Sequence, residues 1–304
     1  MPRECEDRVA IVTGASRGIG QALAQRLAGE GAKVALLGRP AGSRNTQLAG
    51  SLGQTLELVR DTGGTALAVT AELDDPDFDK SQIVKQVQDA FGAAPDILVH
   101  SAAAPREFGG GKPSIPFADT PRDWFFRSVQ TNVWAAWDLA KQVIPGMRQR
   151  GAGWILNISS VQAGPRPRPT EDAAADALGG ACLYGGTKAF LDRITTGAAQ
   201  ELYADNIAVN NLAPTGPVWT PLSATVVPDL PPDVWEPMET MVEAAIALCT
   251  ADPKSLTSRI AYSLPLLAEL GRPVHTLDGT QLFDGWQPET EDSRKQAVSY
   301  LSGH

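Results

Sequence analysis

Cysteine and histidine are scarce in this sequence, and neither is grouped. The chain of 304 residues has three of each, dispersed along its length: Cys5, Cys182, Cys249, His100, His275 and His304. No Cys-x-x-Cys pair and no His/Asp/Glu group has the spacing of metal ligands, so we predict no metal site. The scattered cysteines exclude a disulfide framework and suit a reducing compartment.

Long hydrophobic runs are missing as well. No stretch approaches the roughly 18 apolar residues of a membrane-spanning helix. The charged N-terminal residues lack the apolar core of a signal peptide. We therefore expect a soluble, cytoplasmic protein that does not act at a membrane.

An excess of positive charge is absent too. The formal net charge is −9 and the pI is about 4.9. Such a surface repels phosphate backbones, which excludes nucleic acid as an expected partner. A phosphate-bearing ligand would have to be held by local arginines and backbone N–H groups.

Short apolar runs alternate with longer amphipathic stretches. The expected strands are Val9–Thr13, Lys33–Gly38, Ala66–Thr70, Asp96–His100, Trp154–Ser159 and Ile207–Leu212. The expected helices are Gly20–Gly29, Gln47–Thr62, Asp79–Phe91, Trp124–Arg150 and Tyr184–Tyr203. Because the strands are continuous apolar runs, they read as buried on both faces. The alternation predicts an α/β fold with a doubly wound parallel sheet of the Rossmann type, in one domain over residues 1–304.

Three segments depart from this alternation. Residues 161–182 are expected to be an inserted loop. Residues 215–237 contain six prolines, too many for a regular helix, and are expected to form a lid over the substrate. Residues 265–304 show no clear further βα unit and are treated as a C-terminal extension.

A glycine-rich turn joins the first strand to the first helix. It reads Thr13-Gly14-Ala15-Ser16-Arg17-Gly18-Ile19-Gly20. Gly14 permits the tight turn, Gly18 lets a pyrophosphate approach the backbone, and Gly20 lets helix and strand pack closely. The helix N-terminus supplies free N–H donors, so the turn predicts a dinucleotide site that includes Ser16, Arg17 and Ile19.

The second strand ends without a carboxylate. In such folds this end faces the adenosine ribose, where an acidic residue would accept a hydrogen bond from the 2′-hydroxyl. Arg39 stands there instead, and Arg17 lies in the glycine turn. Two guanidinium groups can chelate a 2′-phosphate, so the sequence favours NADP(H) over NAD(H).

Tyr184 and Lys188 are spaced to share one face of a helix. A cation one turn from a phenol stabilises the phenolate, which suits the phenol to proton transfer. Ser160 follows a strand at the carboxyl edge where ligands bind in such sheets. Asn132 lies inside an expected helix, where asparagine is poorly suited.

Together these motifs resemble the short-chain dehydrogenase/reductase superfamily, from about Asp7 to Leu264. The resemblance implies a catalytic set in which Tyr184 transfers the proton and Ser160 positions a carbonyl. In the same comparison Lys188 binds the nicotinamide ribose, and Asn132 holds a water in a proton relay. The resemblance implies further cofactor contacts: Thr220 binds the nicotinamide carboxamide, Glu72 and Leu73 lie beside the adenine, and Ala102 also contacts the cofactor.

The sequence also departs from that family. His100-Ser101-Ala102-Ala103 stands where Asn-Asn-Ala-Gly is usual, and we interpret His100 as structural. Ser160 and Tyr184 are 24 positions apart, a longer gap than the family has. The usual Asp-Gly-Gly after the last strand is absent.

The expected activity is hydride transfer between NADP(H) and a ketone or secondary alcohol. Phe108, Val161 and Trp219 are candidate substrate contacts, and an apolar lid favours a hydrophobic substrate. Two alternatives stay open: a catalytically silent NADP(H)-binding sensor, and an isomerase or dehydratase that uses the same Tyr-Lys pair. The resemblance implies a homodimer or homotetramer, joined through the helices of Asn132 and Tyr184.

Overall fold

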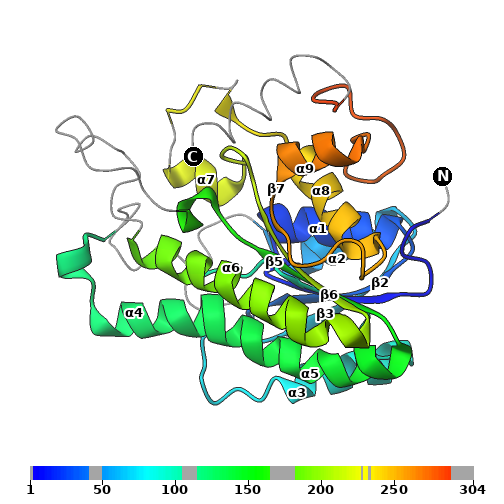
Figure 1. Ribbon diagram of the computed structural model, residues 1–304, viewed down its shortest axis with the longest axis horizontal. Coiled ribbons are helices and arrows are strands. Elements are labelled where there is room, and N and C mark those ends of the chain that lie inside the picture. Colours follow the sequence, from blue (N-terminus) through cyan, green and yellow to red (C-terminus); the bar gives the residue numbers. More distant parts are fainter. Residues whose placement is uncertain are drawn as a thin grey trace.

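The computed structural model describes residues 3–40, 50–104, 115–164, 182–226, 229–231 and 234–288. Within these residues, seven strands form one parallel sheet in the order β3-β2-β1-β4-β5-β6-β7 (Figure 1). The strands are β1 (Val9–Thr13), β2 (Lys33–Gly38), β3 (Thr65–Thr70), β4 (Ile97–His100), β5 (Gly153–Ile158), β6 (Ile207–Ala213) and β7 (Ile260–Tyr262). The predicted doubly wound parallel sheet is confirmed.

Helices cover both faces of this sheet (Figure 1). On one face lie α1 (Gly18–Gly29), α2 (Leu52–Asp61), α8 (Met238–Thr250) and α9 (Ser263–Leu270). On the other lie α3 (Ser81–Phe91), α5 (Ala135–Arg150) and α6 (Cys182–Leu202). A hydrophobic core lies on each face of the sheet, and alternate residues of β1 belong to one or the other. Ala10 and Val12 face α1 and α8, whereas Val9 and Ile11 face α3 and α5. The apolar runs of β1, β2, β4, β5 and β6 are therefore buried on both sides. The run of β3 is not, because β3 is an edge strand, and of its residues only Val69 is buried.

The strand order reverses between β1 and β4, and in such sheets ligands bind at the carboxyl ends of the strands at this place. Thr13, the last residue of β1, is completely buried there. Its hydroxyl oxygen accepts hydrogen bonds from the N–H groups of Ser101 at 3.2 Å and Ala102 at 3.1 Å. The chain leaving β4 is thus fixed beside the glycine turn that follows β1.

Two expected helices differ from the structure. The helix predicted over Gln47–Thr62 begins only at Leu52, because the Ser51 hydroxyl accepts from the Gln54 N–H and caps it; residues 47–49 lie outside the described ranges. The helix predicted over Trp124–Arg150 is α4 (Arg122–Val129) and α5, joined by one π-helical stretch, Gln130–Trp134. Every other predicted end coincides with the structure or differs from it by one or two residues.

Two of the irregular segments also contain regular structure. Within 215–237 a short helix, α7 (Pro221–Val226), forms despite the prolines, because proline is tolerated at the first position of a helix. Val161–Ala163 forms a single 3-10 turn, and Cys182, expected to be in the loop, is the first residue of α6. Residues 165–181 of that insertion lie outside the described part.

The beginning of the C-terminal extension packs against α1 and α8. The helix α9 includes the first residues of the extension, and Val274 beyond it is completely buried. Buried Glu243 on α8 pairs with Arg26 of α1 at 2.9 Å and with Arg272 at 2.6 Å. These ion pairs fasten the extension over the α1–α8 layer. In the described ranges we find no helix with the length and apolarity needed to cross a bilayer.

Candidate functional site

Each glycine of the glycine-rich turn has a geometric reason to be glycine. Gly14 and Gly18 have φ of +67° and +56°, a region that favours glycine. A Cβ on Gly14 would lie 2.9 Å from the backbone N of Ala102. A Cβ on Gly20 would lie 2.4 Å from the carbonyl oxygen of Gly14. The turn is therefore closed tightly against both its own helix and the chain after β4.

The N-terminus of α1 faces the segment that follows β6. Arg17 is the N-cap residue, in extended conformation, and its side chain makes no capping hydrogen bond. A Cβ on Gly18 would lie 3.2 Å from the Thr220 methyl group, so Thr220 borders the glycine turn. The Thr220 hydroxyl oxygen accepts from the Ser223 N–H at 3.0 Å and so also caps α7. Thr220 thus connects the turn to the candidate lid.

The residues expected at the adenosine end lie at neighbouring strand ends. The Ala15 N–H donates to the Leu37 carbonyl at 3.0 Å, which places the glycine turn beside the end of β2. Arg17 and Arg39, each two residues beyond that bond, are both half-buried. The chain after β3 adjoins β2 through a second bond, from the Ala71 N–H to the Gly38 carbonyl at 2.9 Å.

Glu72 and Leu73 follow Ala71 directly. Glu72 is exposed, and Leu73 is buried. An apolar side chain and an acidic one therefore lie at the position where the sequence predicts the adenine.

Tyr184 and Lys188 occupy one face of α6, one turn apart. The Lys188 ammonium nitrogen lies 5.7 Å from the centre of the Tyr184 ring. Its Nζ donates to the Ile158 carbonyl at 2.7 Å, and only 3% of Lys188 is exposed. The end of β5 therefore holds the cation beside the half-buried Tyr184 ring.

Ser160 caps a 3-10 turn that packs on the start of α6. Its hydroxyl oxygen accepts from the Gln162 N–H at 3.2 Å and caps the 3-10 turn. A Cβ on Gly185 would lie 2.4 Å from the Gln162 carbonyl oxygen. The turn that follows Ser160 thus packs directly on the first turn of α6, next to Tyr184.

Asn132 lies in the π-helical stretch and is 2% exposed. Its Oδ1 accepts from the Ala104 N–H at 2.7 Å, and its Nδ2 donates to the Thr187 hydroxyl oxygen at 3.0 Å. Such π-helical stretches are frequent at functional sites. Asn132 therefore links the loop after β4 to the α6 residue that precedes Lys188.

His100 ends β4 beneath these residues and is 5% exposed. Burial lowers the pKa of His100 to about 3, a hydrogen bond with the Ala136 backbone opposes this shift, and the nearby Lys188 charge adds to it. The imidazole is therefore neutral at physiological pH. This environment agrees with the interpretation of His100 as structural.

A polar group next to Lys188 was not predicted from the sequence. Asp192 lies one turn further along α6 and accepts hydrogen bonds from the Ser159 hydroxyl at 2.7 Å and the Asn211 amide. Burial raises the pKa of the Asp192 carboxyl, and these hydrogen bonds and the Lys188 charge oppose that rise. The four-residue spacing from Lys188 to Asp192 could have indicated that the two side chains share a face of the helix. No pattern in the sequence indicates that Ser159 and Asn211 bind Asp192.

The candidate substrate residues are only partly described. Val161 directly follows Ser160 and is half-buried, and Trp219 directly precedes Thr220 and is 59% exposed. Phe108 lies outside the described residues. Each of the two described side chains therefore adjoins a predicted site residue.

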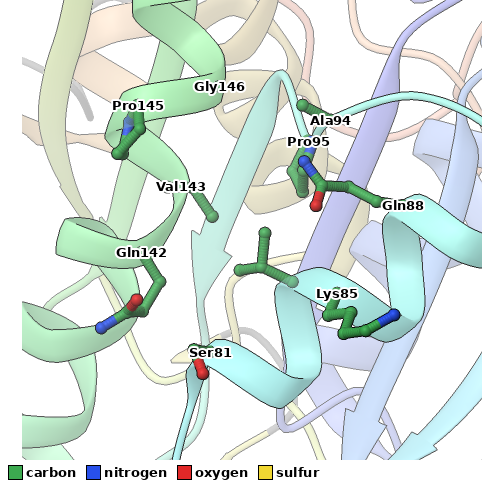
Figure 2. Close-up of a pocket in the computed structure, with 10 residues that line it drawn as sticks. Ser81, Lys85, Gln88, Ala94, Pro95, Gln142, Val143, Pro145 and Gly146 are labelled. Atoms are coloured by element: carbon green, nitrogen blue, oxygen red, sulfur yellow. The ribbon is translucent and has the colours of Figure 1, made fainter.

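A pocket of about 280 Å³ between α3 and α5 is separate from this arrangement (Figure 2). Its lining includes Ala94 and Pro95, which precede the amino end of β4. The candidate catalytic residues gather at the carboxyl ends of the strands, so this pocket takes no part in the site. Across the ranges that the structure describes, no three His, Cys, Asp or Glu side chains are grouped to hold a metal ion.

Comparison with known proteins identifies relatives of this chain. The short chain dehydrogenase family matches residues 8–231. A glucose and ribitol dehydrogenase homolog from Oryza sativa subsp. japonica is 34% identical, over 71% of this chain and 68% of that protein. A 3alpha-hydroxysteroid dehydrogenase from Mediterraneibacter gnavus is 31% identical, over 69% of this chain and 73% of that protein.

Solved structures agree with the sequence relatives. A 3-oxoacyl (acyl-carrier-protein) reductase from Agrobacterium tumefaciens with NADP bound has a TM-score of 0.68 at 25% identity, covering 85% of this chain and 93% of that one. A mutant short-chain dehydrogenase/reductase from Serratia marcescens has a TM-score of 0.69 at 27% identity, covering 86% and 97%. On its sequence, its sheet topology and these relatives, the chain belongs to the short-chain dehydrogenase/reductase superfamily.

Proposed function

We propose that this chain is an NADP(H)-dependent oxidoreductase that transfers a hydride between the nicotinamide and a ketone or secondary alcohol. The observation that carries the proposal is the placement of the Lys188 ammonium against the Tyr184 ring, beside the turn that begins at Ser160. A phenol, an ammonium and a hydroxyl gathered at the carboxyl edge of the sheet are suited to move a proton to and from a carbonyl oxygen.

The cofactor end of the site fits a phosphorylated dinucleotide. The tight glycine turn and the α1 N-terminus without a side-chain cap leave backbone N–H groups for a pyrophosphate. Arg17 and Arg39 supply positive charge near the end of β2, where a 2′-phosphate would lie. The NADP-bound reductase of the same fold supports this choice over NAD(H). A nicotinamide cofactor bound here would supply or accept the hydride.

The protein's own residues would handle the proton and the oxygen. In reduction, the Ser160 hydroxyl donates a hydrogen bond to the carbonyl oxygen while the Tyr184 hydroxyl gives that oxygen its proton. The Lys188 ammonium stabilises the resulting phenolate. In oxidation the phenolate takes the proton from the alcohol. Asn132 fixes α6 through Thr187 and is positioned to join a relay that returns the proton to solvent.

The substrate that we favour is hydrophobic. Trp219 and Val161 are apolar side chains adjacent to Thr220 and Ser160, and together they favour a bulky apolar ketone over a small polar one. The names of the relatives include both a hydroxysteroid dehydrogenase and a glucose and ribitol dehydrogenase homolog, so they do not distinguish an apolar substrate from a polar one. The preference for an apolar substrate therefore rests on Trp219 and Val161.

We also propose a homodimer or homotetramer that forms through α4, α5 and α6. Large aromatic side chains on these helices and on the π-helical stretch between α4 and α5 are between 42% and 54% exposed: Phe125, Phe126, Trp134, Trp137 and Phe190. Apolar groups gathered on one layer are typical of protein–protein contacts. Sedimentation of the protein and of Trp137→Glu tests this, since a monomeric wild type would contradict the proposal.

Nicotinamide absorbance tests the proposed activity. The purified protein is assayed with NADPH and NADH against a panel of small polar and bulky apolar carbonyl compounds, and with the corresponding alcohols in reverse. NADPH-dependent reduction of apolar ketones is the expected result. Tight NADPH binding without turnover in either direction would instead favour a sensor, and equal turnover of polar and apolar ketones would contradict the substrate class.

A further inference from the structure

Glu236 is a buried carboxylate at which several separate segments meet. It immediately precedes the first turn of α8 and is 5% exposed. One oxygen accepts from the N–H groups of Thr215 at 2.6 Å and Gly216 at 3.0 Å. The other accepts from the hydroxyls of Thr240 at 3.0 Å and Ser263. The chain after β6, the start of α8 and the start of α9 are thus tied to one side chain.

All four donors around Glu236 are neutral. Burial raises the pKa of the Glu236 carboxyl, and the hydrogen bonds from Ser263, Gly216, Thr240 and Thr215 act in the opposite direction. A carboxyl group removed from water is costly unless its oxygens are satisfied, and here four donors converge on two oxygens. The arrangement specifies an acceptor at this point: an amide in the same place would direct its own N–H donors at other donors.

Thr215 strengthens the same junction. Its N–H also lies 3.1 Å from the Ser263 hydroxyl oxygen, and its own hydroxyl oxygen accepts from the Leu264 N–H at 3.1 Å. The sequence after β7 lacks the family's Asp-Gly-Gly, and at this place Ser263 donates to Glu236. The acidic group at this junction therefore comes from the chain before α8.

The junction is connected to the predicted nicotinamide site through a short stretch of backbone. Val218 pairs with Glu236 in an isolated parallel bridge. Two residues later, Thr220 contacts the glycine turn, where a Cβ on Gly18 would lie 3.2 Å from the Thr220 methyl group. The stretch from Thr215 to Thr220 is therefore held by Glu236 at one end and by the glycine turn at the other.

We propose that Glu236 is a positioning residue for the nicotinamide end of the cofactor site, acting through the backbone of Thr215 and Gly216 on Thr220. This inference rests on the proposed function. Glu236 does not touch the reacting atoms in this account. It fixes the segment that contacts the nicotinamide, while the glycine turn and the arginines hold the adenosine end independently.

Two ligands separate these ends of the site. NADPH spans both, whereas adenosine 2′,5′-bisphosphate carries the adenosine and its 2′-phosphate but no nicotinamide. Their dissociation constants are measured by calorimetry for the wild type, Glu236→Gln and the matched control Glu239→Gln, a half-buried carboxylate three residues further along the chain. We expect Glu236→Gln to weaken NADPH binding about tenfold and to leave adenosine 2′,5′-bisphosphate binding within about twofold. Glu239→Gln should leave both unchanged.

A second pair of variants covers the case in which Glu236→Gln does not fold. Thr240→Val removes one hydroxyl donor at nearly constant volume, and Thr240→Ser retains it. Thr240→Val should weaken NADPH binding about threefold, and Thr240→Ser should restore it. Unchanged NADPH affinity in the folded variants, or an equal loss for both ligands, would overturn the role of Glu236. If the wild type binds neither ligand, the proposed function fails and this inference fails with it.

Discussion

Gly185 of α6 lies directly against the carbonyl oxygen of Gln162, with room for no larger residue: an added Cβ would be 2.4 Å from that oxygen. This contact joins the turn that follows Ser160 to the turn that carries Tyr184, although the two residues are 24 positions apart in the chain. The geometry of the candidate site therefore depends on this close helix–loop approach.

Gly185→Ala should push α6 away from the Ser160 turn. Because overpacking against backbone cannot be relieved by a side-chain rotation, we expect a loss of roughly 1–3 kcal/mol in the free energy of unfolding and a clear fall in kcat. Gly186→Ala is the matched control, since none of the described residues lies within 4 Å of a Cβ there, and it should stabilise the helix by up to about 1 kcal/mol. Urea unfolding and turnover of both variants check this, and equal behaviour of the two would contradict it.

Removing the acceptor at Asp192 should loosen the end of β5. Asp192→Ala leaves the Ser159 hydroxyl and the Asn211 amide without their partner, which should lower the free energy of unfolding by roughly 1–3 kcal/mol. Because Ser159 adjoins Ser160, kcat should fall as well, with NADPH affinity retained. Asp192→Asn keeps an acceptor oxygen and should behave more like the wild type. If both variants lost the same stability and activity, the charge of Asp192 would matter more than its hydrogen bonds.

His100 should make the protein sensitive to acid. Burial lowers the pKa of His100 to about 3, so between about pH 6.5 and pH 3 the unfolded chain binds a proton that the folded chain does not. Stability from this group is complete above the unfolded-state pKa and is lost as the pH falls through that window. Relative to His100→Asn, the free energy of unfolding of the wild type should fall by roughly 2 kcal/mol between pH 8 and pH 5. Denaturant unfolding at both pH values measures this, and a difference independent of pH would refute the buried neutral imidazole.

The two arginines at the adenosine end should decide the cofactor. Arg39→Ala should raise the KM for NADPH by about tenfold or more and leave the KM for NADH nearly unchanged, since only NADPH carries the 2′-phosphate. Arg17→Ala should act in the same direction. Arg60→Ala, an exposed arginine on α2, is the control and should affect neither cofactor. A preference of the wild type for NADH would show that the assignment of Arg17 and Arg39 is wrong.

Local patterns explain why much of the architecture was predictable. The glycine turn and the Tyr184–Lys188 pair each lie within a few residues, and their spacing alone fixes a tight turn or a shared helix face. The apolar runs likewise predicted the parallel sheet, because only strands buried on both faces read that way.

Other features depend on partners that are distant in sequence. The three hydrogen-bonding segments around Glu236 are separated by up to 27 residues from it, and no spacing indicates that they meet. The π-helical stretch at Asn132 has no residue pattern of its own. The helix α7 was not predicted because the many prolines of residues 215–237 argue against a helix, although the first position of a helix accepts proline.

The most direct test of the account is the turnover number of Tyr184→Phe with NADPH and the best carbonyl substrate of the panel. The substitution retains the aromatic ring on α6 and removes only the hydroxyl. We predict a kcat lower by roughly 10²- to 10⁴-fold, with the dissociation constant for NADPH unchanged. Turnover by Tyr184→Phe at the wild-type rate would contradict the assignment of Tyr184 as the proton donor and acceptor.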